Sequence, residues 1–134
     1  MEYDVVIVGA GPSGLSAAIQ FKKLCKDNNQ NFSVCVVEKG SQIGAHTLSG
    51  AVLEPRALNE LIPDWKNKSS PVQTMVKTEK FIYLSKEKSI RFPNFLLPKV
   101  MHNKNNYIIS LGNFNTWLGK QAEEMGVEIY PGFS

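Results

Sequence analysis

The sequence predicts an α/β fold built around a parallel β-sheet, and three observations lead to this prediction. A β-branched apolar run at residues 4–8 leads directly into a glycine-rich turn. A segment with helical spacing of its apolar residues follows, up to about Lys26. A second apolar run at 33–37 ends at Glu38. Strand, helix and strand in this order form a βαβ unit, whose two strands lie parallel. Because the first run lacks polar alternation, we expect a central strand that is buried on both faces.

The residues after Glu38 predict a long loop and then one short helix. Residues 39–53 are rich in glycine, serine and threonine, which favour loops. Residues 55–62 predict a short helix, which Pro63 ends. Residues 64–79 are polar and show no clear period, so no element is predicted there.

A β-hairpin is predicted in the middle of the chain. The runs at 80–84 and 89–92 have the composition of strands and flank a Lys-Glu-Lys turn. An antiparallel hairpin does not belong inside a parallel sheet, so it indicates an excursion into a second layer or domain. Residues 94–106 carry Pro98 and several asparagines and predict a loop.

The end of the chain predicts a return to the first sheet. Apolar residues at 111–125 follow helical spacing, and Gly126 suits the helix end. Residues 127–130 predict another strand. About three strands are then available, whereas doubly wound α/β folds usually have five or six, so we expect an incomplete sheet. The predicted division is a core with its loop at 1–79, the excursion at 80–110, and the returning helix and strand at 111–134.

Composition restricts the chain to a small set of protein classes. Its 134 residues, 43% of them hydrophobic, can form one compact domain with a core. The 15 Lys and Arg against 12 Asp and Glu leave a net charge of +3, too small an excess to indicate a nucleic-acid partner. No apolar run approaches the ~18 residues of a membrane span. The acidic start of the chain lacks the features of a secretory signal or a transit peptide.

The cysteines predict structure rather than chemistry. Cys25 falls in the first predicted helix and Cys35 in the second predicted strand. Two cysteines cannot supply the four thiolates of a structural zinc site or an iron–sulfur cluster. We expect both to be buried, reduced thiols.

The turn after the first strand has the spacing G-x-G-x-x-G and predicts a dinucleotide site. Gly9 permits a tight turn, Gly11 has no side chain to block a pyrophosphate, and Gly14 lets helix and strand pack closely. Pro12 and Ser13 open the helix, whose N-terminal N–H groups and dipole favour phosphate. A plainer interpretation stays open, in which the glycines serve only packing.

Glu38, 24 residues after Gly14, is the predicted ribose ligand. A carboxylate at the end of the second strand can accept hydrogen bonds from both ribose hydroxyls. It would repel a 2′-phosphate, so NADP is disfavoured. Lys39 beside it is a further candidate. The alternative is that Glu38 is an ordinary acidic residue at a strand end.

The segment after Glu38 favours FAD over NAD. It is a long loop of small residues, in which the backbone can approach a flavin closely. The candidate cofactor contacts in it are Gly44, Ala45, His46, Thr47, Ser49 and Gly50. Two roles stay open for His46: a hydrogen bond near the flavin, or local loop structure. No nucleophilic Ser/His/Asp or Cys/His set is visible, and flavin electron transfer needs none.

These segments together resemble the electron transfer flavoprotein–ubiquinone oxidoreductase family. The resemblance is carried by residues 5–15, by 36–39 and above all by 44–58, GAHTLSGAVLEPRAL. Later stretches agree, at 96–98, 101–103, 106–112, 117–118 and 126–133. It covers nearly the whole chain, and the 44–58 segment is far more specific than the glycine turn.

The resemblance implies a glutathione-reductase-type FAD-binding domain in a peripheral membrane flavoprotein of the respiratory chain. Such proteins pass electrons from reduced electron transfer flavoprotein to ubiquinone, and they carry a [4Fe–4S] cluster in a C-terminal region. That region has no counterpart here, so we expect an N-terminal part or a truncated reading frame that is inactive alone. The implied location is the cytoplasmic face of a bacterial inner membrane, or the matrix face of the mitochondrial inner membrane.

Surface composition leaves further interpretations open. Residues 92–98 form a compact apolar stretch that could line a quinone channel, touch lipid or pack in the second layer. Residues 56–104 carry 10 basic and 4 acidic side chains, a net +6 that would suit anionic lipid headgroups, an acidic partner or simple solvation.

Two alternative functions stay beside the main one. The first is a non-catalytic or vestigial dinucleotide-binding module. The second is another FAD-dependent oxidoreductase, similar to geranylgeranyl reductases or hydroxylases, which fits the glycine turn equally well but the 44–58 segment less well.

Overall fold

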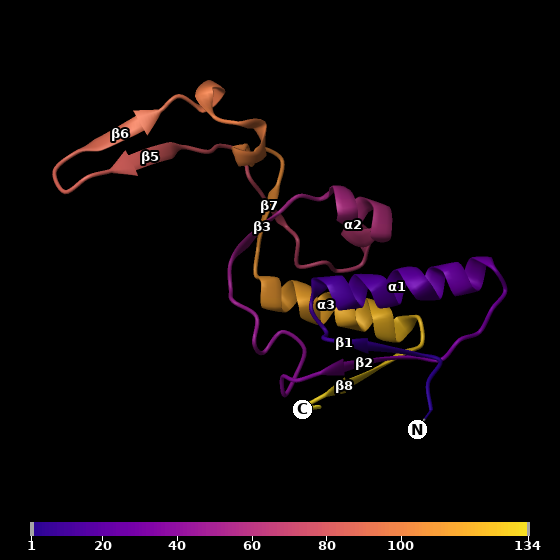
Figure 1. The fold of residues 1–134 in the computed structure, drawn as a ribbon. Helices are drawn as coiled ribbons and strands as arrows, with labels where there is room; N and C mark the ends of the chain where they lie inside the picture. The colour runs from indigo at the N-terminus through magenta and orange to yellow at the C-terminus, as the bar shows by residue number, and fades with distance from the viewer. Residues whose placement is uncertain (1, 134) are drawn as a thin grey trace.

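The computed structural model describes residues 2–133 and confirms a Rossmann-like α/β fold. The parallel sheet has the order β1-β2-β8, formed by Val5–Val8, Val34–Glu38 and Val127–Pro131. Val6 pairs with Cys35, which pairs with Glu128. Helices α1 (Pro12–Asp27) and α3 (Leu111–Glu124) lie side by side on one face of this sheet (Figure 1).

One prediction about β1 is wrong. The expected central strand, buried on both faces, lies at an edge of the three-stranded sheet, among the residues that the structure describes. Val6 is 57% exposed and Val8 85% exposed. The reason is that α1 and α3 cover only the opposite face, toward which Val5 and Ile7 pack.

A second, antiparallel sheet lies on the far side of the two helices. Its order is β3-β7-β4, formed by Ala51–Leu53, Tyr107–Ile109 and Thr74–Met75. The predicted loop at 39–53 therefore ends in a strand, which sequence reasoning missed. This sheet pairs strands from residues 1–79 with a strand from residues 80–110. The pairing does not test the predicted three-part division of the chain, which stays a prediction.

Short helices and a hairpin complete the part of the chain between β3 and α3. The predicted short helix is α2 (Arg56–Leu61), followed by a 3-10 turn at Trp65–Asn67. The predicted hairpin is confirmed as β5 (Phe81–Leu84) and β6 (Ser89–Phe92), which project away from the rest of the molecule (Figure 1). The predicted loop after it contains two further 3-10 turns, Asn94–Leu96 and Lys99–Met101.

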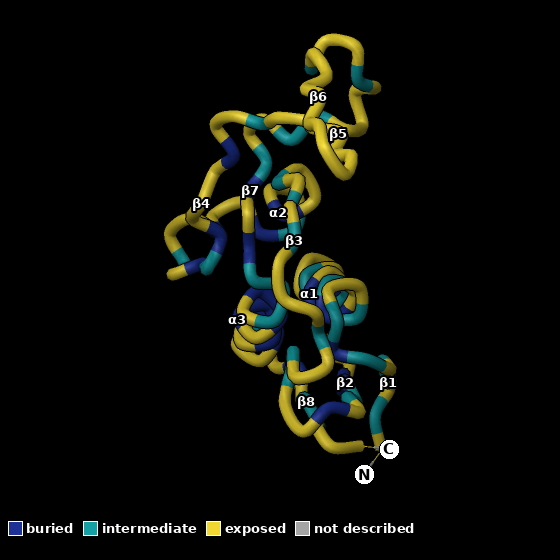
Figure 2. Tube along the Cα trace, turned by 90° about the vertical axis from the view of Figure 1, so that its left-hand side faces the viewer, coloured by how far each residue is buried: buried dark blue, intermediate teal, exposed yellow. Residues whose placement is uncertain are grey.

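One core connects both sheets through the helices. Figure 2 shows buried segments in α1, α3 and β2 and also along β7 and beside α2 and β4, while the hairpin is exposed along its whole length. Leu15 and Leu118, from the two helices, are almost fully buried. The core also includes Trp65, whose indole N–H donates to Asn59 Oδ1 at 2.7 Å. Cys25 and Cys35 are both buried and free, as predicted.

Candidate dinucleotide-binding site

The turn between β1 and α1 is closed by direct backbone packing. Gly9 has a φ of +97°, a conformation that favours glycine. A Cβ on Gly14 would lie 2.0 Å from the Gly9 carbonyl oxygen, which no real atom tolerates. The first intrahelical bond runs from the Leu15 N–H to Gly11 O at 3.0 Å. Two of the three glycines are therefore required by the turn itself.

The outer side of the same turn is open. A Cβ added to Gly11 would meet nothing within 4 Å, so this glycine is not explained by packing in the structure. Gly11 is the N-cap of α1, and Pro12 and Ser13 in the first turn are exposed. The first N–H groups of a helix have no intrahelical partner and carry the positive end of the dipole. This arrangement can bind a phosphate group.

The Glu38 carboxylate ties the end of β2 to the glycine turn. Its Oε2 accepts from the Ala10 N–H at 2.8 Å, and its Oε1 from the Gly40 N–H at 2.7 Å. These two bonds, the one from Gly40 first, lower the pKa of Glu38; partial burial opposes them and the nearby His46 adds to them. The carboxylate is therefore ionised at neutral pH. Each oxygen keeps a second lone pair, with which it can accept from a ribose hydroxyl.

The loop after Glu38 is held at its start by the end of β8. Gly132 N–H donates to Gly40 O at 2.7 Å, and Phe133 N–H donates to Glu38 O at 2.9 Å. Gly40 is buried, whereas its neighbour Lys39 is exposed. The carboxyl ends of the three parallel strands thus meet at this loop, which is where open α/β sheets bind ligands.

Farther along, the loop packs on α3. Gly44 has a φ of +84°, and a Cβ on it would lie 2.8 Å from Gly112 O. Thr47 N–H donates to Gly44 O at 3.1 Å, which closes a turn. The Thr47 side chain accepts a hydrogen bond from Asn115. Ala45, His46, Ser49 and Gly50, also predicted contacts, are exposed on the outer side of the loop.

The structure brings together only part of the predicted set by direct contact. The glycine turn and Glu38 are joined through Ala10. The 44–50 loop is instead linked to α3, and His46 acts on Glu38 only through its charge. That these residues contact a cofactor stays a prediction for every one of them.

Sequence reasoning missed the residues that position the loop. They are Gly40, Gly112, Asn115, Thr116 and Gly119. A signal was available for two of them, because Gly112 and Gly119 stand in a helix, where glycine is unfavourable unless something packs closely.

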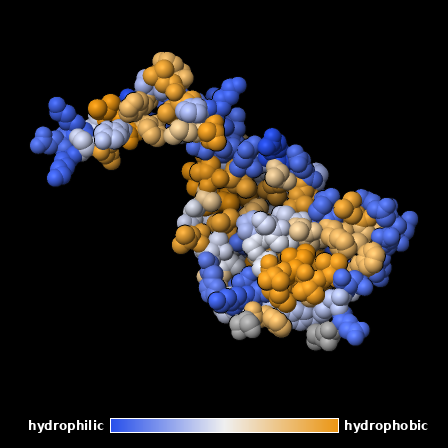
Figure 3. All heavy atoms as spheres, in the orientation of Figure 1, coloured by the Kyte–Doolittle hydropathy of each residue, from blue (hydrophilic) through white to orange (hydrophobic). Residues whose placement is uncertain are grey.

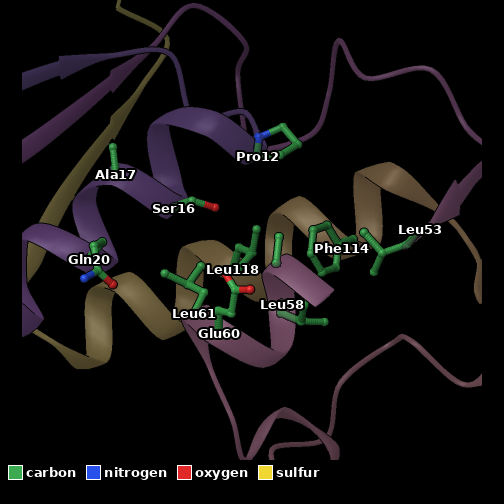
Figure 4. A pocket seen from close by; sticks show the side chains of 11 residues that line it. Pro12, Ser16, Ala17, Gln20, Leu53, Leu58, Glu60, Leu61, Phe114 and Leu118 are labelled. Atoms are coloured by element: carbon green, nitrogen blue, oxygen red, sulfur yellow. The ribbon is translucent and has the colours of Figure 1, made fainter. Parts of the chain in front are cut away.

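A separate groove of about 600 Å³ opens between α1, α2 and α3 (Figure 4). It is lined mainly by apolar side chains, among them Leu53, Leu61 and Phe114, with Gln20 and Glu60 at its rim. Pro12 is the only predicted site residue in its lining. Because it includes neither Glu38 nor the 39–50 loop, this groove is not the candidate dinucleotide site.

Residues 2–133 contain neither a candidate metal cluster nor a candidate membrane span. No group of three or more His, Cys, Asp or Glu side chains there could hold a metal ion. None of the helices in that range is long and apolar enough to cross a bilayer.

The comparison with protein families agrees with this geometry. Residues 7–76, slightly more than half of the chain, match the family described as NAD(P)-binding Rossmann-like domain. The chain belongs to this family. The match begins in β1 and includes the glycine turn, Glu38 and the loop that follows.

Curated relatives are similar over essentially the whole chain. An electron transfer flavoprotein-ubiquinone oxidoreductase from Pseudomonas aeruginosa is 60% identical over 135 residues. The mitochondrial protein of that name from Dictyostelium discoideum is 59% identical over 133 residues, and that from Bos taurus 53% over 134. These alignments cover 99–100% of this chain but only 24%, 22% and 21% of the respective relatives. The chain thus spans between a fifth and a quarter of their length.

Solved structures share the fold at low sequence identity. A geranylgeranyl bacteriochlorophyll reductase-like protein from Thermoplasma acidophilum has a TM-score of 0.62 at 21% identity, over 97% of this chain and 30% of that one. A 2-methyl-3-hydroxypyridine-5-carboxylic acid oxygenase mutant has a TM-score of 0.59 at 22% identity, over 98% and 32%. At this identity the likeness concerns the fold alone.

The residues present fit a bound dinucleotide. The open space at Gly11 lies at the free N-terminus of α1, where a pyrophosphate needs room and N–H donors. Glu38 is held in place and ionised beside it, as a ribose ligand requires.

Gly11 and Gly14 make a matched pair for testing this site. We expect Gly11→Ala to lower the free energy of unfolding by no more than about 1 kcal/mol, because the added methyl meets no atom and alanine is only a weaker N-cap than glycine. We expect it to weaken dinucleotide binding about tenfold or more, since the methyl occupies the phosphate position. Gly14→Ala should weaken dinucleotide binding and, unlike Gly11→Ala, also lower the thermal unfolding midpoint. A Gly11→Ala protein with unchanged affinity, measured by isothermal titration calorimetry with FAD, would refute the phosphate position.

Glu38 should contribute stability that depends on pH. Folding lowers its pKa from the ordinary value of 4.5, so the ionised carboxylate stabilises the folded state above that pH. This contribution is lost as the pH falls through the lower pKa of the folded state. The difference in unfolding free energy between wild type and Glu38→Gln should therefore be largest near neutral pH and shrink below pH 4.5. Urea unfolding at several pH values measures it, and a difference that does not change with pH contradicts the assignment.

Proposed function

We propose that this chain forms the FAD-binding part of an electron transfer flavoprotein–ubiquinone oxidoreductase. The observation that carries the proposal is identity of 52–60% to proteins of that name over essentially all of its residues. The geometry supports it, because the glycine turn, the helix N-terminus and Glu38 meet at one end of the parallel sheet.

The 39–50 loop favours FAD as the dinucleotide. It continues from the ribose-binding position along the same end of the sheet and is held there by β8 and α3. It contains glycine at 40, 44 and 50, so the backbone can approach a flat ring system closely.

In this proposal the chain binds and orients, and the cofactor supplies the redox chemistry. A bound flavin supplies electron exchange in steps of one or two. The N-terminus of α1 holds the pyrophosphate, and Glu38 accepts from the ribose hydroxyls. In this proposal the exposed loop residues, His46 among them, cover the ring system from water. No side chain of this chain needs to move a proton.

The partners proposed for the full protein are reduced electron transfer flavoprotein and ubiquinone, as the names of the relatives state. A [4Fe–4S] cluster needs four cysteine ligands, and this chain has two cysteines. The cluster is therefore proposed for the portion of the relatives that this chain does not match.

Peripheral membrane association is proposed through the β5–β6 hairpin. Both faces of its first strand are apolar, and Ile82, Tyr83 and Leu84 are 47%, 59% and 72% exposed. Figure 3 shows this arm as mixed apolar surface with a hydrophilic tip. Residues 77–104 carry seven basic and two acidic side chains, which favours an anionic lipid surface. The proposed location is the bacterial inner membrane at its cytoplasmic face, or the mitochondrial inner membrane at its matrix face.

The proposed activity can be tested on the protein at its full encoded length. We expect bound FAD, an iron–sulfur signal in electron paramagnetic resonance, and reduction of a ubiquinone analogue by reduced electron transfer flavoprotein. FAD without a cluster would favour another FAD-dependent oxidoreductase, such as a reductase or hydroxylase of this fold. Absence of FAD would favour the non-catalytic dinucleotide-binding module.

The hairpin can be tested by vesicle co-sedimentation. We expect Ile82→Glu combined with Leu84→Glu to weaken binding to vesicles that contain anionic phospholipid about tenfold or more, because two exposed apolar side chains become charged. The matched control is Leu24→Glu, because Leu24 is 50% exposed on α1, far from the hairpin. Equal loss of binding in both variants would contradict a specific role of the hairpin.

A further inference from the structure

One face of helix α3 packs against residues 43–47, the middle of the 39–50 loop. Gly44 packs against Gly112, because a Cβ added to Gly44 would lie only 2.8 Å from the Gly112 carbonyl oxygen. Ile43 lies over Gly119, where an added Cβ would come within 2.4 Å of its Cδ1 atom. Thr116 Oγ1 lies 3.3 Å from Ile43 O. These contacts recur every three to four residues along α3, so one face of the helix holds the loop.

Asn115 stands at the centre of this surface and is almost completely buried, at 1% exposure. Its Nδ2 donates to Thr47 Oγ1 at 3.1 Å. Its Oδ1 is buried without a hydrogen-bond partner among residues 2–133. Burying an amide with half its capacity unused is unfavourable, and an apolar residue would avoid the cost. A role in packing therefore does not explain an asparagine here.

The direction of the Asn115–Thr47 bond has a chemical consequence. A threonine hydroxyl has one hydrogen to donate and two lone pairs that accept. Because Asn115 donates to Thr47, the hydroxyl hydrogen is not used in that contact. Thr47 can therefore donate its hydrogen to another acceptor at the loop surface, where it is half-buried.

We propose that Asn115 is a positioning residue for the cofactor. It holds residues 43–47 on α3, and it orients the Thr47 hydroxyl so that this group donates to an acceptor atom of bound FAD. The inference rests on the proposed function, since it takes FAD as the ligand of the loop.

Four variants of the full-length protein separate positioning from packing. Asn115→Leu removes the amide and keeps the bulk, and Asn115→Asp replaces the donor with an acceptor. Thr47→Val removes the hydroxyl, and Thr47→Ser keeps it. The control is Gln121→Leu, because Gln121 is a buried amide on the same helix that lies beside Lys23 and Asp64 rather than the loop.

Three readouts are used: the dissociation constant for FAD, the flavin absorption spectrum, and amide hydrogen exchange of the apoprotein. We expect Asn115→Leu, Asn115→Asp and Thr47→Val each to weaken FAD binding about tenfold, and Thr47→Ser to restore it to within about threefold. The double variant Asn115→Leu with Thr47→Val should be no weaker than either single one, since both break one chain of bonds. The flavin absorption spectrum should shift in the three weakened variants only.

In the apoprotein, Asn115→Leu should raise exchange at residues 43–50 and leave β1 and α1 unchanged. Gln121→Leu should change neither exchange in the loop nor FAD affinity. Wild-type affinity and spectrum in Asn115→Asp and Thr47→Val would overturn the inference, even if Asn115→Leu failed to fold. If the wild type binds no FAD, the proposed function fails, and unchanged loop exchange in Asn115→Leu would then overturn the loop-holding role separately.

Discussion

The approach of α1 to β1 at Gly14 is the constraint on which the site depends. With only 2.0 Å between a Cβ there and the Gly9 carbonyl oxygen, any side chain would push the helix away from the strand. The contact places the N-terminus of α1 at the carboxyl end of β1. Glu38 can then reach the Ala10 N–H from the neighbouring strand. The proposed phosphate-binding and ribose-binding positions thus depend on one packing contact and one carboxylate.

Helix α3 has a second organising role, between the parallel sheet and the second layer. Leu118 is buried in the common core, and Trp117 donates its indole N–H to Lys68 O at 2.9 Å. On another face, Asn115 and the small residues Gly112 and Gly119 contact the 39–50 loop. A helix that follows the glycine turn by about 100 residues therefore shapes the loop of the same site.

Two of the places with exposed apolar side chains lie outside this organised centre. One is the bare face of β1 with Val6 and Val8, and the other is the β5–β6 hairpin. The sequence predicts β1 and both strands of the hairpin, and the structure confirms all three. The prediction of burial is wrong for β1. The sequence predicts a central strand, yet in residues 2–133 helices cover only one side of β1. Local composition reports that a strand can be buried, whereas its neighbours decide whether it is.

The sequence by itself determined the βαβ unit, the glycine turn, Glu38, the hairpin and the returning helix and strand. Each of these depends on residues close together in the chain, through periodicity, turn chemistry or strand composition. The tertiary structure alone decided the pairing of β3 with β7, the edge position of β1 and the contact of Asn115 with Thr47. These join segments more than 50 residues apart, or depend on which layers cover a strand, and no local pattern encodes such contacts.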